Sequence, residues 1–519
     1  MKSIQPMTHT FLGIGLLLVL GGDALAQSVT IDVDSQKQSI RGYGGMNHPV
    51  WIGDLTAEQR ETAFGNGPGQ IGMSVLRMHV DENSTNWSQE VPTAKRALEL
   101  GATVFASPWN PPSQMTEVVN GDKRLRYDMY DAYATHLNDF YHFMADNGVD
   151  LYAISVQNEP DYATDWTAWT PDEMLRFMKE NAISIDTRII APESFQYRKN
   201  MSDPILNDAT ALANLDILGA HLYGTQLQDF PYPLFKQNGA GKELWMTEVY
   251  TDSSNDADLW PNALDVAYNI HNSMVEAEFN AYVWWYIRRS YGPIKEDGQV
   301  SKRGYCMAHY SKFIRPGAVR VDATKNPDTD MYVSAYVSGS DVVIVVVNKS
   351  TSSKSIAFSV SGADISSYEM FTTSSSKSLS DDGPITATNN SFSTMFDAQS
   401  VTTLRGTDDA LNVGGTGGAL TTGGVASTGG VASTGGIASG TGGLGGQHLS
   451  SGGTSSEATG GSTLSTGGAW TPDSQIGSTS ASSSCGCRMV GASRTNSTSL
   501  AFTLVGLLSM LALRRRKHS

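Results

Sequence analysis

The spacing of apolar residues changes once along the chain, near Pro316. Before this point, short apolar runs alternate with longer stretches in which apolar residues recur every three or four positions. A short apolar run is typical of a strand that is buried on both faces of a parallel sheet, and successive parallel strands need a crossover helix between them. Eight such runs occur, at residues 40–45, 75–80, 103–109, 152–158, 188–193, 215–223, 243–249 and 281–287.

These runs and the helical stretches between them predict a (β/α)8 barrel, the TIM-barrel fold of the α/β class, over residues 39–317. The clearest helix start is Thr170-Pro-Asp-Glu173, which places threonine at the N-cap, proline at the first helical position and glutamate at the third. Further helices are expected over residues 127–147 and 261–278. A doubly wound open sheet is the alternative, but the glycine-rich turn of dinucleotide-binding folds does not follow the first run.

After residue 317 the helical period is absent, and strand-like runs are separated by clusters of Ser, Gly and Asp. Residues 318–406 therefore predict an all-β side domain, most simply a β-sandwich. Residues 27–38 contain one more alternating run, which has no partner before the barrel begins. We expect this N-terminal strand to pair with the side domain and to tie it to both ends of the barrel.

The N-terminus has the pattern of an exported protein. Residues 1–26 contain a basic start, an apolar core at 11–20 and the cleavage pattern Ala24-Leu-Ala26. This pattern predicts a secretory signal peptide, and a membrane anchor is the alternative.

The C-terminal part of the chain has no pattern of a packed core. Residues 411–484 are rich in Gly, Ser and Thr and repeat with a six-residue period, which predicts a flexible linker, with a β-solenoid as the alternative. Residues 485–519 hold Cys485-Gly-Cys487, an apolar segment and a basic tail, and they resemble the C-terminal sorting signals of myxobacterial surface proteins. We expect a secreted protein that is displayed on the cell surface or attached to the membrane through this segment.

Composition excludes several classes of function. The net charge of −16 and a pI near 5 argue against nucleic acid as a partner, although a local basic site could still bind an acidic ligand. The histidines and cysteines show none of the usual metal-binding spacings, so neither a metal nor a cofactor is expected. Cys306 is expected to be a buried apolar residue, and the chain is expected to act as a monomer.

Two glutamates stand where the chemistry of a barrel enzyme is found. Glu159 follows the fourth apolar run in Asn158-Glu159-Pro160, and Glu248 lies near the end of the seventh. The C-terminal ends of barrel strands face the active site, so the two carboxyl groups should meet there. One protonated and one ionised carboxyl group are what glycoside hydrolysis requires. The alternative is that these are two unrelated glutamates, one at the surface and one in a buried ion pair.

Other side chains at the same strand ends fit a sugar site. Asn158 could donate to a sugar hydroxyl, and Tyr223 could bond to the attacking carboxylate or be a core-edge tyrosine. Arg289 could bind the carboxylate of an acidic sugar, although a surface charge is the simpler interpretation of it alone. Aromatic side chains that could pack on sugar rings, or belong to the core, are Trp51, Trp109, Trp285 and Tyr291.

Four stretches together resemble glycoside hydrolase family 30, in particular the bacterial glucuronoxylanases of its subfamily 8. They are Gly42-Tyr-Gly-Gly-Met-Asn-His-Pro-Val-Trp51, Ser155-Val-Gln-Asn-Glu-Pro160, Trp245-Met-Thr-Glu-Val-Tyr250 and Trp284-Trp-Tyr-Ile-Arg-Arg-Ser-Tyr-Gly-Pro-Ile-Lys-Glu-Asp-Gly298. The resemblance covers residues 28–405 and implies a retaining endo-β-1,4-xylanase that acts on glucuronoxylan.

The resemblance also implies roles for individual residues. Glu159 would be the acid/base and Glu248 the nucleophile. The positions that match the binding site for the (4-O-methyl)glucuronate branch are Arg289, Tyr291, Tyr250, Ser253 and Trp285. The positions that match the sugar site at the point of cleavage are Trp109, Asn158 and Tyr223. The alternatives are a related β-glucosidase or endo-1,6-glucanase of the same family, and a non-catalytic carbohydrate-binding protein of the cell surface.

Overall fold

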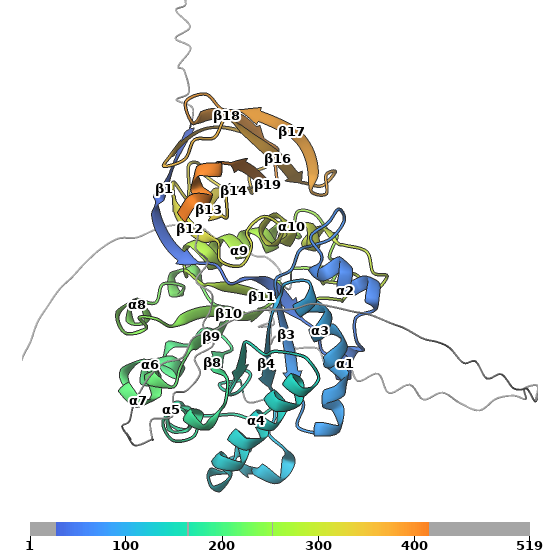
Figure 1. Cartoon of the computed structure of the whole chain (residues 1–519), viewed down its shortest axis with the longest axis vertical. Coiled ribbons are helices and arrows are strands. Elements are labelled where there is room, and N and C mark those ends of the chain that lie inside the picture. Colours follow the sequence, from blue (N-terminus) through green and yellow to red (C-terminus); the bar gives the residue numbers. More distant parts are fainter. Residues whose placement is uncertain (1–26, 163–165, 252, 415–519) are drawn as a thin grey trace, which may run out of the picture. The chain divides into compact units, whose positions relative to one another are not determined.

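The computed structural model describes residues 27–162, 166–251 and 253–414 (Figure 1). The predicted signal peptide, almost all of the predicted linker and the predicted sorting signal lie outside the described residues. Within the described part of the chain, no helix is both long and apolar enough to cross a membrane.

Parallel strands form a closed barrel, which confirms the predicted (β/α)8 class. The strands follow one another around the barrel in the order of the sequence, as eight buried apolar runs joined by helices require. They are β2 (Gly42–Met46), β3 (Val75–Val80), β4 (Thr103–Pro108), β7 (Ala153–Ser155), β8 (Arg188–Ser194), β9 (Ile217–His221), β10 (Glu243–Val249) and β11 (Ala281–Tyr286).

Helices surround this barrel (Figure 1). They are α1 (Pro49–Ile52), α2 (Ala57–Phe64), α3 (Val91–Glu99), α4 (Tyr130–Asp146), α5 (Pro171–Glu180), α6 (Lys199–Asn207), α7 (Ala209–Ala213), α8 (Pro233–Asn238), α9 (Leu264–Val275) and α10 (Lys302–Ser311). A hairpin, β5 (Thr116–Val119) and β6 (Asp122–Leu125), lies between β4 and α4. Helix α5 begins with the predicted capping box of Thr170 and Glu173. Helix α9 is shorter than predicted at both ends, and Glu278, beyond its C-terminal end, takes a left-handed conformation (φ 58°).

The interior of the barrel is packed with apolar side chains. They come from seven of the barrel strands, and include Val75, Phe105, Ile190, Ile217, Trp245 and Val283. Trp245 meets Phe105 edge to face, with ring centroids 5.4 Å apart. Because this core fills the barrel, polar groups that point inward gather at the C-terminal ends of the strands.

The strand ends that carry glutamates are all irregular. Met246 and Val249 both pack in the outer core, and the register shift between them brings Glu248 round toward the barrel axis. A second register shift lies in β8 at Glu193, which has a left-handed backbone (φ 55°). Strand β7 ends at Ser155, earlier than predicted, and Glu159 follows with φ 42°. Such conformations cost roughly 1–3 kcal/mol each in a non-glycine residue and concentrate at functional sites.

The remaining strands form one continuous nine-stranded sheet, which confirms the predicted all-β side domain. The sheet curls so far that its edge strands β17 and β18 contact one another. Strand β1 (Gln27–Ser39) pairs with β12 and β15, so the first described segment is part of this sheet. The others are β12 (Val319–Ala323), β13 (Met331–Ser338), β14 (Asp341–Asn348), β15 (Lys354–Ser361), β16 (Ser367–Thr373), β17 (Ser380–Thr386), β18 (Ser391–Phe396) and β19 (Ser400–Thr407).

Strand β14 is apolar on both faces because each face packs in a different core. Val343 and Val345 pack in the barrel core, whereas Val342 and Ile344 pack in the core of the side domain. Helix α10 adds polar contacts across the same boundary, since both ring nitrogens of buried His309 lie 2.9 Å from threonine hydroxyls of β16 and β19. The side domain is therefore packed against the barrel.

Candidate active site

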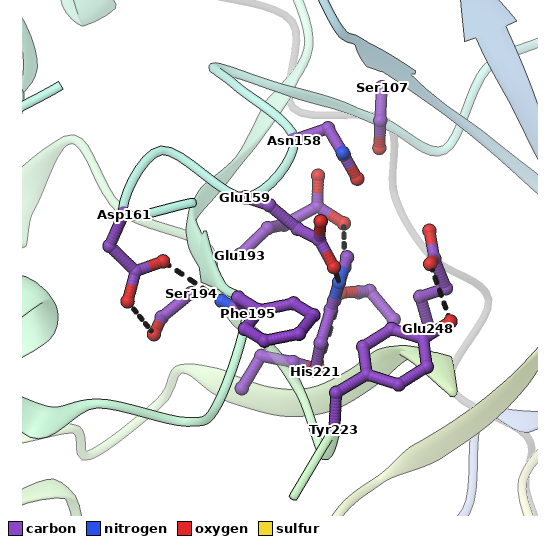
Figure 2. A network of polar contacts seen from close by, with 12 residues as sticks. Ser107, Asn158, Glu159, Asp161, Glu193, Ser194, Phe195, His221, Tyr223 and Glu248 are labelled. Atoms are coloured by element: carbon purple, nitrogen blue, oxygen red, sulfur yellow. Dashed lines mark hydrogen bonds and ion pairs between the residues drawn. The ribbon is translucent and has the colours of Figure 1, made fainter. Parts of the chain in front are cut away.

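Three glutamates meet at the C-terminal end of the barrel, each from a different strand end (Figure 2). Glu159 follows β7, Glu193 lies in β8 and Glu248 lies in β10. All three are buried, with exposed fractions of 3%, 0% and 5%. The predicted pair is therefore brought together, with a third carboxyl group beside it.

Arg77 on β3 supplies a positive charge that pairs with two of these glutamates inside the barrel. Its guanidinium is fully buried and forms ion pairs with Glu248 and with Glu193, the latter at 3.2 Å. It also donates to Asn158 Oδ1 at 2.7 Å and to Ser107 Oγ at 3.2 Å. A buried arginine with several carboxylate and amide partners fixes their positions as well as their charge.

Glu159 is poised to hold a proton. Its Oε1 lies 2.8 Å from His221 Nδ1 at the end of β9. Burial raises the pKa of Glu159 to about 7, helped by the charge of Glu248 and opposed by the contacts with His221 and Arg77. Near neutral pH this carboxyl group can therefore both give and take a proton, as a general acid/base must.

Glu248 is held as an acceptor of hydrogen bonds. The Tyr223 hydroxyl donates to its Oε1 at 2.7 Å, and Arg77 donates to its other oxygen. Both partners are donors, so both carboxylate oxygens are held in place as acceptors. The hydrogen bond expected between Tyr223 and the carboxylate of Glu248 is present.

The two predicted carboxyl groups are close to each other. An oxygen of Glu159, an oxygen of Glu248 and a ring nitrogen of His221 all lie within 4.8 Å of one another. Retaining glycosidases hold their carboxyl groups about 5–5.5 Å apart, whereas inverting enzymes leave about 6.5–9.5 Å for a water molecule. The spacing fits direct attack by one carboxylate and leaves too little room for the inverting arrangement.

Glu193 and His221 form a charged layer below this pair. Burial would raise the pKa of Glu193, but Arg77 and His221 together lower it to about 2. Burial would lower the pKa of His221, but the charge of Glu248 and the contacts with Glu159 and Glu193 raise it to about 9. An ionised Glu193 and a protonated His221 thus face each other, with His221 Nε2 3.7 Å from Glu193 Oε1.

Aromatic side chains line one side of the site. Trp109 directly follows β4 and is almost fully buried, with Arg77 stacked 4.8 Å from its ring centre. Trp51 and Trp285 lie 5.6 and 5.9 Å from Trp109, between ring centroids. Trp51 is 46% exposed, which leaves an aromatic face open to a ligand. The structure therefore groups three of the four predicted aromatics beside Arg77 and the two predicted glutamates.

The residues expected at the acidic branch lie at the ends of β10 and β11. Tyr250 and Tyr291 pack with their ring centroids 5.2 Å apart. The half-exposed Arg289 lies 3.5 Å from Glu296, which is a long contact, and 5.1 Å from the Tyr286 ring centre. Ser253 is exposed nearby, where Arg303 Nη2 lies 3.4 Å from its hydroxyl.

The neighbouring Arg288 has a different role. It donates to the backbone carbonyls of Ile52 and Gly53, at 2.5 and 3.1 Å, and so fixes the end of α1 beside Trp51. The two consecutive arginines therefore have different roles. Arg288 binds backbone carbonyls of the protein, whereas Arg289 lies at the rim of the barrel mouth.

Sequence reasoning did not assign functional roles to Arg77, Glu193 or His221. A signal was present for the first two, since each is a charged residue in an apolar run predicted to be buried on both faces. His221 gave a weaker signal, because a histidine in a buried strand is common in ordinary cores.

Two groups of described residues could offer three metal ligands each, although sequence spacing predicted no metal site. The first is Glu159, His221 and Glu248, and the second is His48, His79 and Glu90, with ligand atoms within 4.8 Å of one another. In the second group, burial lowers the pKa of His79 to about 3 and raises the pKa of Glu90 well above its usual range. A protonated Glu90 is a poor ligand, so this group is better described as a neutral buried cluster, and His48 stacks under Trp51.

No protein-family model matches the chain. Among characterised proteins, the glucuronoxylanase XynC of Bacillus subtilis (strain 168) is 62% identical over 404 residues, which cover 76% of this chain and 95% of that protein.

Two solved structures are similar over the whole of their own length. A glycoside hydrolase family 30 endoxylanase from Clostridium papyrosolvens has a TM-score of 0.70 and 47% identity, covering 73% of this chain and 100% of that one. A family 30, subfamily 8 xylanase from Clostridium acetobutylicum has a TM-score of 0.68 and 34% identity, covering 74% of this chain and 100% of that one.

Proposed function

Because the chain belongs to glycoside hydrolase family 30, we propose that it hydrolyses the β-1,4-xylan backbone of glucuronoxylan by endo-cleavage with retention of configuration. The observation that carries this proposal is the buried pair of Glu159 and Glu248, whose oxygens lie within 4.8 Å. The similarity to glucuronoxylanases extends over the barrel and the side domain and supports xylan rather than a glucoside or a 1,6-glucan as the substrate.

In the first step Glu248 attacks the anomeric carbon of the sugar at the cleavage point. Arg77 and Tyr223 donate to its two oxygens and fix the carboxylate in orientation. Glu159 gives its proton to the glycosidic oxygen, so the C–O bond breaks and the downstream part of the chain leaves as an alcohol. The product is a glycosyl ester on Glu248.

In the second step Glu159, now ionised, takes a proton from water, and the water oxygen attacks the same carbon and releases Glu248. Protonated His221 stabilises Glu159 in this ionised state, because its Nδ1 lies 2.8 Å from the carboxylate. A pKa near 7 serves both steps, since the same group acts first as an acid and then as a base.

The acidic branch would select which bond is cut. Arg289 at the rim is the cation best placed to pair with a glucuronate carboxylate, because its present contact with Glu296 is long and its side chain is partly exposed. Tyr250, Tyr291, Ser253 and Trp285 would surround the branch. Asn158, whose Oδ1 is held by Arg77, turns its amide nitrogen away from Arg77, where it can donate to a sugar hydroxyl.

Product analysis tests this function directly. Purified protein incubated with glucuronoxylan should release new reducing ends, and mass spectrometry should find one glucuronate per oligosaccharide at a fixed distance from the reducing end. Products with random branch positions would refute branch-directed cleavage, and the absence of new reducing ends would refute the enzyme assignment.

Arg289→Ala separates branch recognition from catalysis. Removing one partner of a charge-assisted pair costs on the order of 2–5 kcal/mol. Activity on glucuronoxylan should therefore fall steeply, while the weak activity on unbranched xylan should stay nearly unchanged. Arg126→Ala is the matched control, because Arg126 is also partly exposed and paired with one acidic residue, Asp128. Equal losses on both substrates would contradict the role of Arg289.

For the location of the protein, we propose secretion and display at the cell surface. The signal-peptide pattern at 1–26 and the sorting-signal pattern at 485–519 support this. Mass spectrometry of the mature termini tests it, since processing should remove residues before Gln27 and, at the other end, the apolar segment after Cys487.

A further inference from the structure

Aromatic rings form a continuous arc around the mouth of the barrel, and only one half of it is explained by branch recognition. From Tyr291 the arc passes through Tyr250 to Tyr223, with centroid separations of 5.2 and 5.6 Å. From Tyr223 it continues to Phe195 and Tyr162, at 5.2 and 4.5 Å. Tyr223 is the midpoint, because its hydroxyl bonds to Glu248.

The second half of the arc lies on the side of Glu159. The indole nitrogen of Trp166 donates to the Glu159 carbonyl at 3.2 Å, and Trp166 lies 5.5 Å from Tyr162, between ring centroids. Glu159 protonates the oxygen that leaves with the downstream part of the xylan chain. That downstream part, the aglycone, must therefore lie on the side where these rings stand.

Phe195, which stacks with both Tyr223 and Tyr162, is anchored through Asp161 (Figure 2). Its backbone N–H donates to Asp161 Oδ1 at 2.9 Å, and the Ser194 hydroxyl donates to Asp161 Oδ2 at 2.8 Å. Asp161 thus joins the loops that follow β7 and β8. The Phe195 ring stacks against both Tyr162 and Tyr223 and is only partly buried, so the exposed part of this stack offers apolar surface that a sugar ring can contact.

A hollow of about 430 Å³ begins at Gln196, the residue after Phe195. Its lining is rich in hydrogen-bonding side chains, which include the amides of Gln196 and Gln228, the hydroxyl of Thr225 and the charged groups of Arg198, Lys199 and Asp229. Gly224, which has φ 67°, closes the turn after β9, and a Cβ there would stand 3.0 Å from Gln196 Nε2. Donors and acceptors of both kinds suit the hydroxyl groups of a sugar chain.

We propose that Phe195 and Tyr162, with the hollow beyond Gln196, bind the xylose units on the leaving-group side of the cut bond. This site rests on the proposed function, since it is defined by the side to which Glu159 gives its proton. Its chemistry is apolar contact with Phe195 and Tyr162 together with hydrogen bonds from the hollow, and it needs no charge on the sugar. It would let the enzyme act within a chain, because it holds xylan beyond the bond that is cut.

Two substrates with the same glycone test the site in Phe195→Ala. One is glucuronoxylan, which has a long aglycone, and the other is a branched xylotrioside carrying a methylumbelliferyl leaving group, which has no aglycone sugar. We expect kcat/KM on the polymer to fall about tenfold, which corresponds to about 1.4 kcal/mol, and to change less than about twofold on the aryl substrate. Phe195→Trp should retain most of the activity on both.

Acceptor trapping gives a readout that general damage to the fold would not produce. Added xylobiose should occupy the aglycone site and replace water in the second step, so that its hydroxyl attacks the glycosyl ester. The ratio of this transfer product to hydrolysis product should fall in Phe195→Ala. Tyr127→Ala, at an exposed tyrosine on the 3₁₀ turn Tyr127–Met129, should leave both measurements unchanged.

The outcomes distinguish this site from the proposed function. Equal losses on both substrates would show that Phe195 supports Tyr223 or Glu159 instead, and no loss on either would show that xylan does not contact it. Both results overturn the aglycone site while leaving the enzyme assignment intact. Failure of the unmutated protein to cleave either substrate would overturn the proposed function itself.

Discussion

The barrel mouth and the side domain bury very different groups. At the mouth, Arg77, Glu159, Glu193, His221 and Glu248 are all within 5% of full burial. The core of the side domain consists of apolar side chains such as Val333, Ile344 and Phe358. Apolar burial stabilises a fold at about 25 cal/mol per Å², whereas buried charges lose hydration and seldom add net stability. The charges at the mouth are therefore best understood through the chemistry they perform.

The conformation of the backbone differs in the same way. Glu159 and Glu193 have left-handed backbones, and Glu248 follows a register shift. The central strands of the side domain, β13, β14 and β19, pair over their whole length without a shift, and its left-handed residues, such as Asp330 and Asn389, lie in turns between strands. An irregular backbone and buried charge occur together at the residues where catalysis is proposed. Mutations there should reduce activity, whereas mutations in the core of the side domain should reduce stability alone.

The largest effect is expected from removing the nucleophile. Glu248→Gln keeps the shape and the hydrogen bond from Tyr223 but cannot form the glycosyl ester, so kcat on glucuronoxylan should fall by on the order of 10⁴-fold or more. Initial rates of reducing-end release measure this. Glu369→Gln, on an exposed position of β16, is the control and should be unchanged. A residual rate within about tenfold of the wild type would contradict the assignment.

Arg77→Met should damage both activity and stability. It leaves Glu193 and Glu248 without their buried partner, which should lower the free energy of unfolding by about 3–5 kcal/mol. Loss of the groups it positions should reduce kcat by about 10²–10³-fold. Urea denaturation and initial rates check the two effects. Arg77→Lys keeps the positive charge but lacks the planar guanidinium, so its rate and its free energy of unfolding should lie between those of Arg77→Met and the wild type. Equal values for the two variants would show that the geometry of the guanidinium matters and that a positive charge alone does not replace it.

The pH dependence should report the proton on Glu159. Glu159 must be protonated in the first step, so kcat/KM should fall as pH rises above about 7, the pKa to which burial raises this group. His221 opposes that rise through its hydrogen bond and charge. His221→Asn should therefore raise the pKa of Glu159 further and move the alkaline limb of the pH–rate profile to higher pH, even though the rate itself falls. An unmoved or lowered limb would refute this coupling.

The smallest effect on activity is expected in the side domain. Ile344→Ala opens a cavity in an apolar core and should lower the free energy of unfolding by about 2–5 kcal/mol, while kcat of the folded enzyme stays the same. Denaturation curves and rates measured well below the midpoint test both points. Met395→Ala, at an exposed position of β18, should change neither quantity. A large fall in kcat for Ile344→Ala would show that the side domain controls the site.

Much of the architecture could be predicted from the apolar pattern. The runs at 75–80 and 243–249 became β3 and β10 with the predicted bounds, because strands buried on both faces leave an unmistakable apolar run. The helix start at Thr170 was equally clear, since its capping box is a local interaction between residues three apart. Boundaries that depend on tertiary contacts, such as the early end of β7, were predicted less well.

The sequence by itself determined the barrel, the all-β side domain and the two glutamates at strand ends, because each follows from local periodicity or from a short motif. Only the tertiary structure decided which way those glutamates point. A register shift after Met246 turns Glu248 inward, and no local pattern shows it. The structure also decided that Arg77, Glu193 and His221 surround the pair. These residues lie far apart in the chain, and the closed barrel alone brings their charges within range of one another.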